Sequence, residues 1–154
     1  KEYGILNGTA LTDTITTDCF LRDFQLTYAT LFSGVRHDSG DPFEWGEKMI
    51  KHYQSLGIDP KSKTLLFSDA LDFERADKLY KHFCNQINVA FGIGTYLSND
   101  TDVPTLNIVM KTVKCNGMDV AKVSDTPGKG MCNNPEYVDY LNRCIEWRMK
   151  NSQI

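Results

Sequence analysis

Residues 35 to 42 read Val-Arg-His-Asp-Ser-Gly-Asp-Pro, and this stretch predicts a strand that ends in a polar turn and leads directly into a helix. The strand would cover Val35 to His37, after an apolar lead-in. Asp41 is a typical N-cap residue, and Pro42 suits the first turn of a helix because its missing N–H would have no partner there. The end of such a strand is where α/β proteins place their ligand chemistry. Asp, Ser and Gly also form ordinary tight turns, so this segment alone leaves both interpretations open.

The rest of the chain repeats this alternation of strand and helix. Short apolar runs with the character of strands lie at residues 8–14, around 35, at 64–67 and at 87–91. Amphipathic helices are expected between them, over about 16–31 as one continuous helix, 42–56 and 73–83. Strands that alternate with helices of this length predict an α/β fold with a parallel sheet or barrel.

Polar or glycine residues follow each of the four expected strands. Asp13, Asp38 and Asp69 end the first three, and the segment from Gly92 to Gly94 ends the fourth. Consecutive parallel strands end at one edge of a sheet, so these residues are expected to face a common cavity. A single aspartate at a strand end is weak evidence, but three in equivalent positions favour a ligand site over simple turns.

The residue types indicate which ligand would suit this edge. Converging carboxylates repel one another unless a divalent cation, ribose hydroxyls or a guanidinium compensates them, and Arg36 and Mg²⁺ are the candidates. Gly92 and Gly94 would let backbone N–H groups approach an anion closely. A metal, carboxylates for sugar hydroxyls and a phosphate loop together predict a phosphorylated sugar ligand.

A different pattern begins after residue 105. Two β-rich runs, at 106–113 and 118–123, flank Asn116-Gly117, which predicts a hairpin with a type I′ turn. A helix is expected over about 135–150, and the Pro-Gly-Lys run at 127–129 has the composition of a surface turn. The expected division is therefore residues 1–105 for part of an α/β barrel and residues 106–154 for a hairpin-plus-helix tail that packs on another domain.

Composition excludes several classes of protein. The 154 residues carry a net charge of −3 with an estimated pI of 5.6, so there is no basic surface for nucleic acid. No apolar run reaches membrane-spanning length and no signal segment is apparent, which predicts a cytoplasmic protein without a membrane partner. Five cysteines without a C-x-x-C pair predict reduced thiols, packed in helices at Cys19, Cys84 and Cys144. The start at Lys1, close to a strand, suggests a fragment of a longer protein.

Separated along the chain, in order, are the motifs GTALTDT, GVRHDSGDPFEWGEK, FSDALDF, NVAFGIGTYLSND, LNIVMKTVKCNG and AKVSDTPGK. Together they resemble the C-terminal portion of nicotinate phosphoribosyltransferase. The resemblance extends over practically the whole chain. It is specific because HDSGDP, FSDxLD and FGIGT occur together and in this order.

This resemblance implies part of a type II phosphoribosyltransferase. Its fold would be an irregular TIM-like barrel with a C-terminal β-hairpin and helix, a smaller N-terminal domain, and a homodimer at full length. The family joins nicotinate to phosphoribosyl pyrophosphate and forms nicotinate mononucleotide and pyrophosphate in NAD salvage. Mg²⁺ is the implied cofactor, and ATP is the implied co-substrate, hydrolysed through a transiently phosphorylated histidine.

The matching motifs imply roles for ten residues of this chain. Catalytic roles fall to Asp13, Arg36 and Asp38, and Asp13 and Asp38 would also hold Mg²⁺, directly or through water. Substrate-binding roles, mainly at the ribose and its 5′-phosphate, fall to Ser39, Gly40, Ser68, Asp69, Gly92, Gly94 and Thr95.

Other parts of the family's site have no counterpart in this sequence. The phosphorylated histidine and the aromatic residues that enclose the pyridine ring precede the region matching Lys1, and His37, His52 and His82 do not take that place. The chain alone is therefore expected not to catalyse the reaction. Two alternatives stay open: a catalytically inert phosphate-binding fragment, and a related phosphoribosyltransferase that uses nicotinamide or quinolinate.

Overall fold

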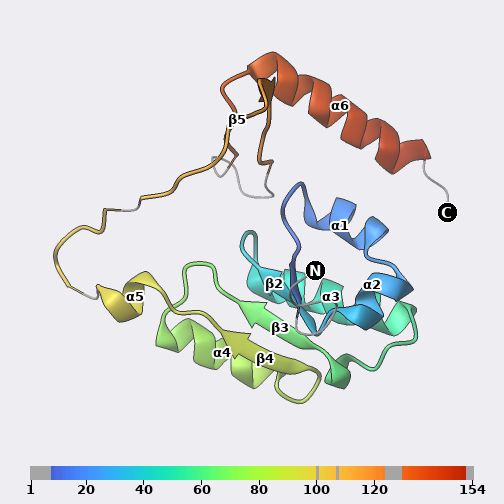
Figure 1. Ribbon diagram of the computed structural model, residues 1–154. Coiled ribbons are helices and arrows are strands. Elements are labelled where there is room, and N and C mark those ends of the chain that lie inside the picture. The colour runs from blue at the N-terminus through green and yellow to red at the C-terminus, as the bar shows by residue number, and fades with distance from the viewer. Residues whose placement is uncertain (1–7, 100, 107, 124–129, 152–154) are drawn as a thin grey trace.

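Four parallel strands form the centre of the computed structural model, which describes residues 8–99, 101–106, 108–123 and 130–151 (Figure 1). They are β1 (Thr9–Leu11), β2 (Gly34–His37), β3 (Thr64–Phe67) and β4 (Asn88–Phe91). The strands lie side by side in chain order, and Val35 is in register with Leu65, which in turn is in register with Val89. The predicted parallel α/β fold is confirmed. In the described part of the chain the sheet is open, with β1 and β4 at its edges, and does not close into a barrel.

The remaining elements connect these strands or follow them in the chain. They are α1 (Thr17–Asp23), α2 (Leu26–Leu31), α3 (Pro42–Ser55), the 3-10 helix η1 (Pro60–Ser62), α4 (Phe73–Phe83), α5 (Thr95–Ser98), β5 (Lys114–Cys115), β6 (Met118–Asp119) and α6 (Pro135–Asn151). The Asp41 carboxylate accepts hydrogen bonds of 2.9 Å from two backbone N–H groups and caps α3 as predicted. Gly57, with φ of +72°, follows the end of α3. None of the described helices is both long and apolar enough to span a membrane.

Helices α3 and α4 cover one face of the sheet. The Phe67 ring of β3 lies 5.4 Å from the Trp45 ring of α3 and 5.6 Å from the Phe83 ring of α4. The preceding helical region reaches α3 as well, because the Phe24 ring lies 6.5 Å from the Tyr53 ring. These buried side chains form one apolar core. Sequential strand order with the covering helices on one face is the arrangement of a singly wound sheet, as in α/β barrels.

The expected single helix over 16–31 is wrong. Helix α1 ends at Asp23, Phe24 leaves helical geometry with ψ of 60°, and α2 begins at Leu26. The break lets the Phe24 side chain reach the core, where it is 4% exposed. The Phe24 carbonyl bonds to the His52 ring at 2.7 Å in place of a helical partner. Burial of an aromatic side chain outweighs the loss of one helical turn.

The predicted hairpin is present but much shorter than expected. Asn116 and Gly117 have φ of +50° and +78°, as a type I′ turn requires, yet β5 and β6 contain two residues each. Residues 108–113 form no strand, because no described strand lies beside them to complete a ladder. Figure 1 shows this segment as a long extended connection between α5 and β5.

Two aromatic side chains of α4 lie on the surface. Phe73 and Tyr80 of α4 are 66% and 52% exposed, because the inward face of this helix is already filled by smaller or better-placed side chains: Ala76, Leu79 and Phe83. All five cysteines are free, which agrees with reduced thiols. Cys19 is buried as expected, but Cys84 and Cys144 are exposed, so the expectation of packed thiols is wrong for these two.

A buried lysine supports the start of β3. Lys63 is 7% exposed, and its ammonium donates hydrogen bonds of 2.8 Å to the carbonyls of Thr30 and Phe32, at the end of α2. Burial lowers the pKa of Lys63 from its ordinary value.

Candidate active site

Asp13 and Ser39 connect the ends of β1 and β2. Asp13 follows β1 and is 1% exposed, and Ser39 lies in the turn after β2 and is 3% exposed. The Ser39 hydroxyl donates a hydrogen bond of 2.8 Å to Asp13 Oδ2. A buried carboxylate held in this way has a fixed orientation at the edge of the sheet.

A lysine that sequence reasoning did not single out joins the two predicted carboxylates. Lys122 Nζ lies 3.6 Å from Asp13 Oδ2 and 3.6 Å from Asp38 Oδ2. Lys122 comes from the segment after β6, and its backbone pairs with that of Met131 in an antiparallel bridge. This positive charge compensates two acidic side chains that would otherwise repel each other.

Arg36 links Asp38 to Ser68, which follows β3. Its guanidinium donates to Ser68 Oγ at 2.8 Å and to Asp38 Oδ1 at 3.4 Å. The Ser68 hydroxyl in turn donates to the carbonyl of His37 at 3.0 Å. At the next strand end, a Cβ on Gly92 would lie 3.2 Å from the Ser68 Cβ, so a side chain there would be crowded. We call the residues Asp13, Arg36, Asp38, Ser39, Ser68 and Lys122 the rim cluster.

A hydrogen-bond relay beneath the rim cluster fixes its supporting strands. The Trp45 indole of α3 donates to Thr12 Oγ1 at 2.8 Å, and the Thr12 hydroxyl donates to the Arg36 carbonyl at 3.2 Å. Thr12 and Trp45 are 1% and 5% exposed. This relay ties the end of β1 both to β2 and to the covering helix.

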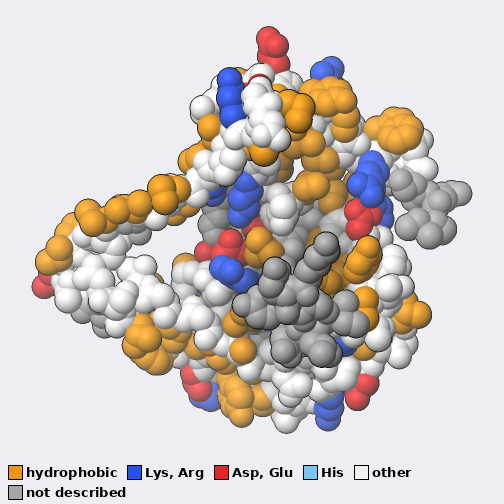
Figure 2. Space-filling view, viewed as in Figure 1, with side chains coloured by type: hydrophobic (Ala, Val, Ile, Leu, Met, Phe, Trp, Pro, Cys, Tyr) orange, Lys and Arg blue, Asp and Glu red, His pale blue; other side chains and the backbone are white. Residues whose placement is uncertain are grey.

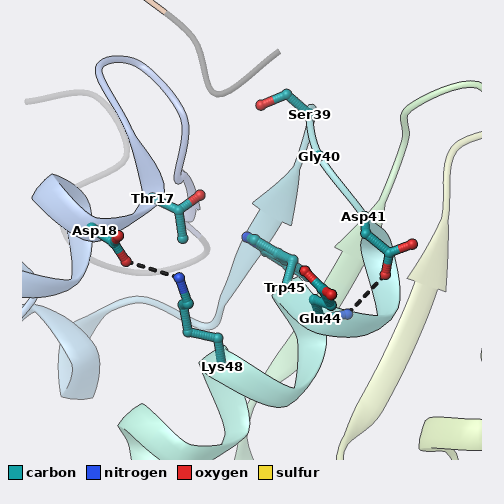
Figure 3. Close-up of a pocket in the computed structure, with 8 residues that line it drawn as sticks. All are labelled: Thr17, Asp18, Ser39, Gly40, Asp41, Glu44, Trp45 and Lys48. Atoms are coloured by element: carbon teal, nitrogen blue, oxygen red, sulfur yellow. Dashed lines mark hydrogen bonds and ion pairs between the residues drawn. The ribbon is translucent and has the colours of Figure 1, made fainter.

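A small pocket adjoins the rim cluster at the start of α3 (Figure 3). Its volume is about 180 Å³, and it is lined by Thr17, Asp18, Ser39, Gly40, Asp41, Glu44, Trp45 and Lys48. An ion pair of 2.8 Å between Lys48 and Asp18 crosses it. The pocket shares the Ser39–Gly40 turn with the rim cluster, and Gly40 has φ of +83°, which favours glycine at this turn.

The other predicted residues lie at the same end of the sheet but outside the rim cluster. Asp69 is half-buried in the turn after β3. Gly94 precedes the short helix α5, and a Cβ there would meet no atom within 4 Å, while Thr95 is the first residue of α5 and is exposed. The Pro-Gly-Lys run at 127–129 lies outside the described residues.

Comparison with known proteins identifies the family. A sequence model of the nicotinate phosphoribosyltransferase (NAPRTase) family matches residues 1–147. The chain belongs to this family. A nicotinate phosphoribosyltransferase of Photorhabdus laumondii is 57% identical over 147 residues, which are 95% of this chain and 36% of the relative.

Solved structures of nicotinate phosphoribosyltransferases share the fold of this chain. The Vibrio cholerae protein superposes with a TM-score of 0.88 at 46% identity, over 92% of this chain and 36% of that one. The Porphyromonas gingivalis protein gives 0.82 at 43% identity, over 90% of this chain and 38% of that one. The chain thus spans about a third of the length of the family members it matches.

In this member of the family, the rim cluster presents two carboxylates to a single shared cation. Asp13 and Asp38 already share one cation, the ammonium of Lys122. Among the described residues, no group of three or more His, Cys, Asp or Glu side chains could hold a metal ion. Mg²⁺ commonly uses one or two carboxylates and takes its other ligands from water and substrate phosphates.

Proposed function

We propose that this chain is part of an enzyme that transfers a phosphoribosyl group from phosphoribosyl pyrophosphate to nicotinate. The products would be nicotinate mononucleotide and pyrophosphate, with Mg²⁺ as cofactor and ATP as co-substrate, in NAD salvage. Family membership supports the reaction class. The observation that carries the proposal is the rim cluster, in which two carboxylates at the ends of β1 and β2 alternate with two cationic side chains, one from β2 and one from the tail.

The chemistry of this transfer suits the charges of the rim cluster. The bond from the anomeric carbon to pyrophosphate oxygen breaks, and a bond from the same carbon to the pyridine nitrogen forms. Positive charge develops on the ribose during this exchange, and Asp13 and Asp38 would stabilise it electrostatically. Because Ser39 holds Asp13 in a buried position, no reorientation is needed when that charge appears.

Negative charge develops on the departing pyrophosphate at the same time. When bound, Mg²⁺ would neutralise part of this charge. Arg36 is hydrogen-bonded to both Ser68 and Asp38, so its guanidinium is positioned to support the Asp38 carboxylate, which would help to hold the metal. A side chain that attacks the sugar covalently is not needed in this mechanism.

The phosphate end of the substrate would lie toward β3 and β4. Ser68 and Asp69 would contact the ribose and its 5′-phosphate from the end of β3. Gly92, Gly94 and Thr95 would provide close backbone approach from the end of β4. The open space around Gly94 supports this assignment, because it leaves room for a ligand there.

The barrel predicted from the sequence remains part of this proposal. Strands β1 to β4 are in chain order, and one face carries the covering helices. The other face carries Arg36 and Leu66 and is less buried than the helical face. Additional strands from the other two thirds of a full-length relative would close this sheet into an irregular TIM-like barrel.

The tail, residues 106–154, would pack against that same part of the full-length protein. Leu106, Ile108 and Met110 are between 76% and 92% exposed. Figure 2 shows the apolar side chains along the extended arm on the left of the molecule. A soluble protein rarely exposes this much apolar surface along one segment unless another part of the protein or a partner covers it.

The function can be tested in a full-length hybrid, in which residues 1–147 of this chain replace the matching segment of a bacterial family member. Nicotinate, nicotinamide and quinolinate are compared as substrates, with and without ATP. We expect transfer to nicotinate to exceed transfer to the other two bases, and ATP to stimulate it. A folded hybrid that transfers the phosphoribosyl group to none of the three bases would refute the proposed function of this chain. Light scattering on the same hybrid should give the mass of a homodimer.

A further inference from the structure

Lys122 has a place in the rim cluster that neither the motifs nor the family comparison assigns. We propose that Lys122 is a positioning residue whose ammonium occupies the cation position between Asp13 and Asp38 before substrate binds, and which turns onto the pyrophosphate when Mg²⁺ arrives with it. This inference rests on the proposed function, since pyrophosphate is the leaving group of that reaction.

The geometry around Lys122 is that of a cation shared by two acids. Its Nζ atom is 3.6 Å from one carboxylate oxygen of Asp13 and 3.6 Å from one of Asp38. Asp13 is almost fully buried, whereas the Asp38 side chain is 28% exposed. A buried carboxylate beside a second acid needs a nearby positive charge, and Lys122 supplies it in the structure.

The Lys122 head group is held less tightly than the backbone of the same residue. Lys122 N and O form hydrogen bonds of 3.2 and 3.1 Å with Met131, which fix the main chain. Both distances from Nζ exceed the roughly 2.7–2.9 Å of a short charge-assisted hydrogen bond, so neither acid holds the ammonium tightly. The flexible four-carbon stem allows the charge to shift while the main chain stays in place.

A divalent cation and the Lys122 ammonium would compete for the same two carboxylates. A divalent cation that arrives alone must displace the ammonium of Lys122, which then has no other anion to contact among the groups of the rim cluster. A cation that arrives with pyrophosphate brings a new anionic partner for the displaced lysine. Metal binding and pyrophosphate binding should therefore depend on Lys122 in opposite directions.

The experiment measures binding to the full-length hybrid without turnover. Mn²⁺ replaces Mg²⁺ and is followed by the electron paramagnetic resonance signal of the free ion, and inorganic pyrophosphate is titrated calorimetrically in the presence of Mg²⁺. Lys122→Met should tighten Mn²⁺ binding roughly tenfold, the scale on which one nearby charge alters proton binding by a carboxylate. The same change should weaken pyrophosphate binding by a similar factor.

Three further variants control the result. Lys122→Arg keeps the positive charge and should restore both affinities toward the original values. Lys122→Gln can still donate hydrogen bonds to the two acids, so it provides a neutral variant if the methionine variant does not fold. Lys114→Met makes the same substitution at an exposed lysine of β5 and should leave both affinities unchanged.

Unchanged or weaker Mn²⁺ binding in the folded neutral variants would overturn the inference. A loss of both affinities together would show that Lys122 only holds the local structure, which also overturns it. The base-specificity assay is independent of these measurements. A hybrid that fails to transfer to nicotinate but shows the two opposite changes would refute the proposed reaction and leave the role of Lys122 standing.

Discussion

Replacing Ser39 with alanine tests whether the fixed orientation of the buried Asp13 carboxylate contributes to catalysis. The Ser39 hydroxyl donates to Asp13 Oδ2 at 2.8 Å, and both residues are at least 97% buried. A hydrogen bond to a charged group contributes about 1.5–3 kcal/mol. If Asp13 must keep this orientation as charge develops on the ribose, losing that energy in the transition state lowers kcat/KM roughly 10- to 150-fold.

The assay is steady-state transfer by the full-length hybrid at saturating nicotinate and Mg²⁺, with phosphoribosyl pyrophosphate varied. Ser55→Ala is the matched control, since the Ser55 hydroxyl also makes a 2.8 Å hydrogen bond, to the His52 carbonyl, but at the exposed end of α3. We expect the control to keep the original kcat/KM. Circular dichroism of both variants checks that the fold is retained.

A double-mutant cycle with Asp13→Asn shows whether Ser39 acts through Asp13. The two effects on kcat/KM should be strongly non-additive, because the hydroxyl is expected to influence turnover only by holding this carboxylate. A folded Ser39→Ala hybrid within twofold of the Ser55→Ala control would refute the reasoning. Full additivity in the cycle would place the contribution of Ser39 elsewhere.

Four more predictions follow from individual contacts. Asp38→Asn should cut kcat sharply without unfolding the hybrid, and near-normal turnover would remove Asp38 from the site. Gly94→Val should raise the KM for phosphoribosyl pyrophosphate while leaving stability nearly unchanged, because a side chain there meets open space; an unchanged KM would contradict ligand contact. Thr12→Val should lower the free energy of unfolding of the sheet by about 1–3 kcal/mol, because the Trp45 indole loses its buried acceptor. Hydrogen exchange measures this loss. The same substitution in a Trp45→Phe background should cost much less. Burial lowers the pKa of Lys63, so the unfolded chain binds more protons than the folded chain at alkaline pH. The free energy of unfolding should therefore rise with pH in that range. Lys63→Met should flatten this rise, measured by hydrogen exchange at several pH values.

The junction of β2 and α3 could be predicted because its signals are local. An aspartate cap and a proline in the first turn each act within a few residues. The alternation of buried strands with amphipathic helices is also visible at short range. Parallel pairing then brings Asp13 and Asp38 to one edge, so part of the candidate site follows directly from the fold.

Other features depend on contacts between distant segments. The break between α1 and α2 arises because Phe24 packs against residues of α3, and nothing near Phe24 in the sequence specifies this contact. The short length of β5 and β6 likewise reflects what lies beside them, whereas strand propensity alone predicts longer strands. Apolar periodicity indicates that a face is buried, but it does not identify the surface that buries it.

Lys122 shows most clearly why the site was only partly predictable, and it also connects the site to the tail. Lys122 falls in the second run of the expected hairpin and in the AKVSDTPGK motif, but neither assigns it a role. In the structure it lies against the two acids at the end of the sheet. Its backbone belongs to the same tail whose apolar arm is exposed. If that arm packs on the remainder of the full-length protein, the packing also sets the position of the Lys122 charge. A polar substitution in the arm, far from the rim cluster, would then weaken pyrophosphate binding through Lys122 without changing any residue of the sheet.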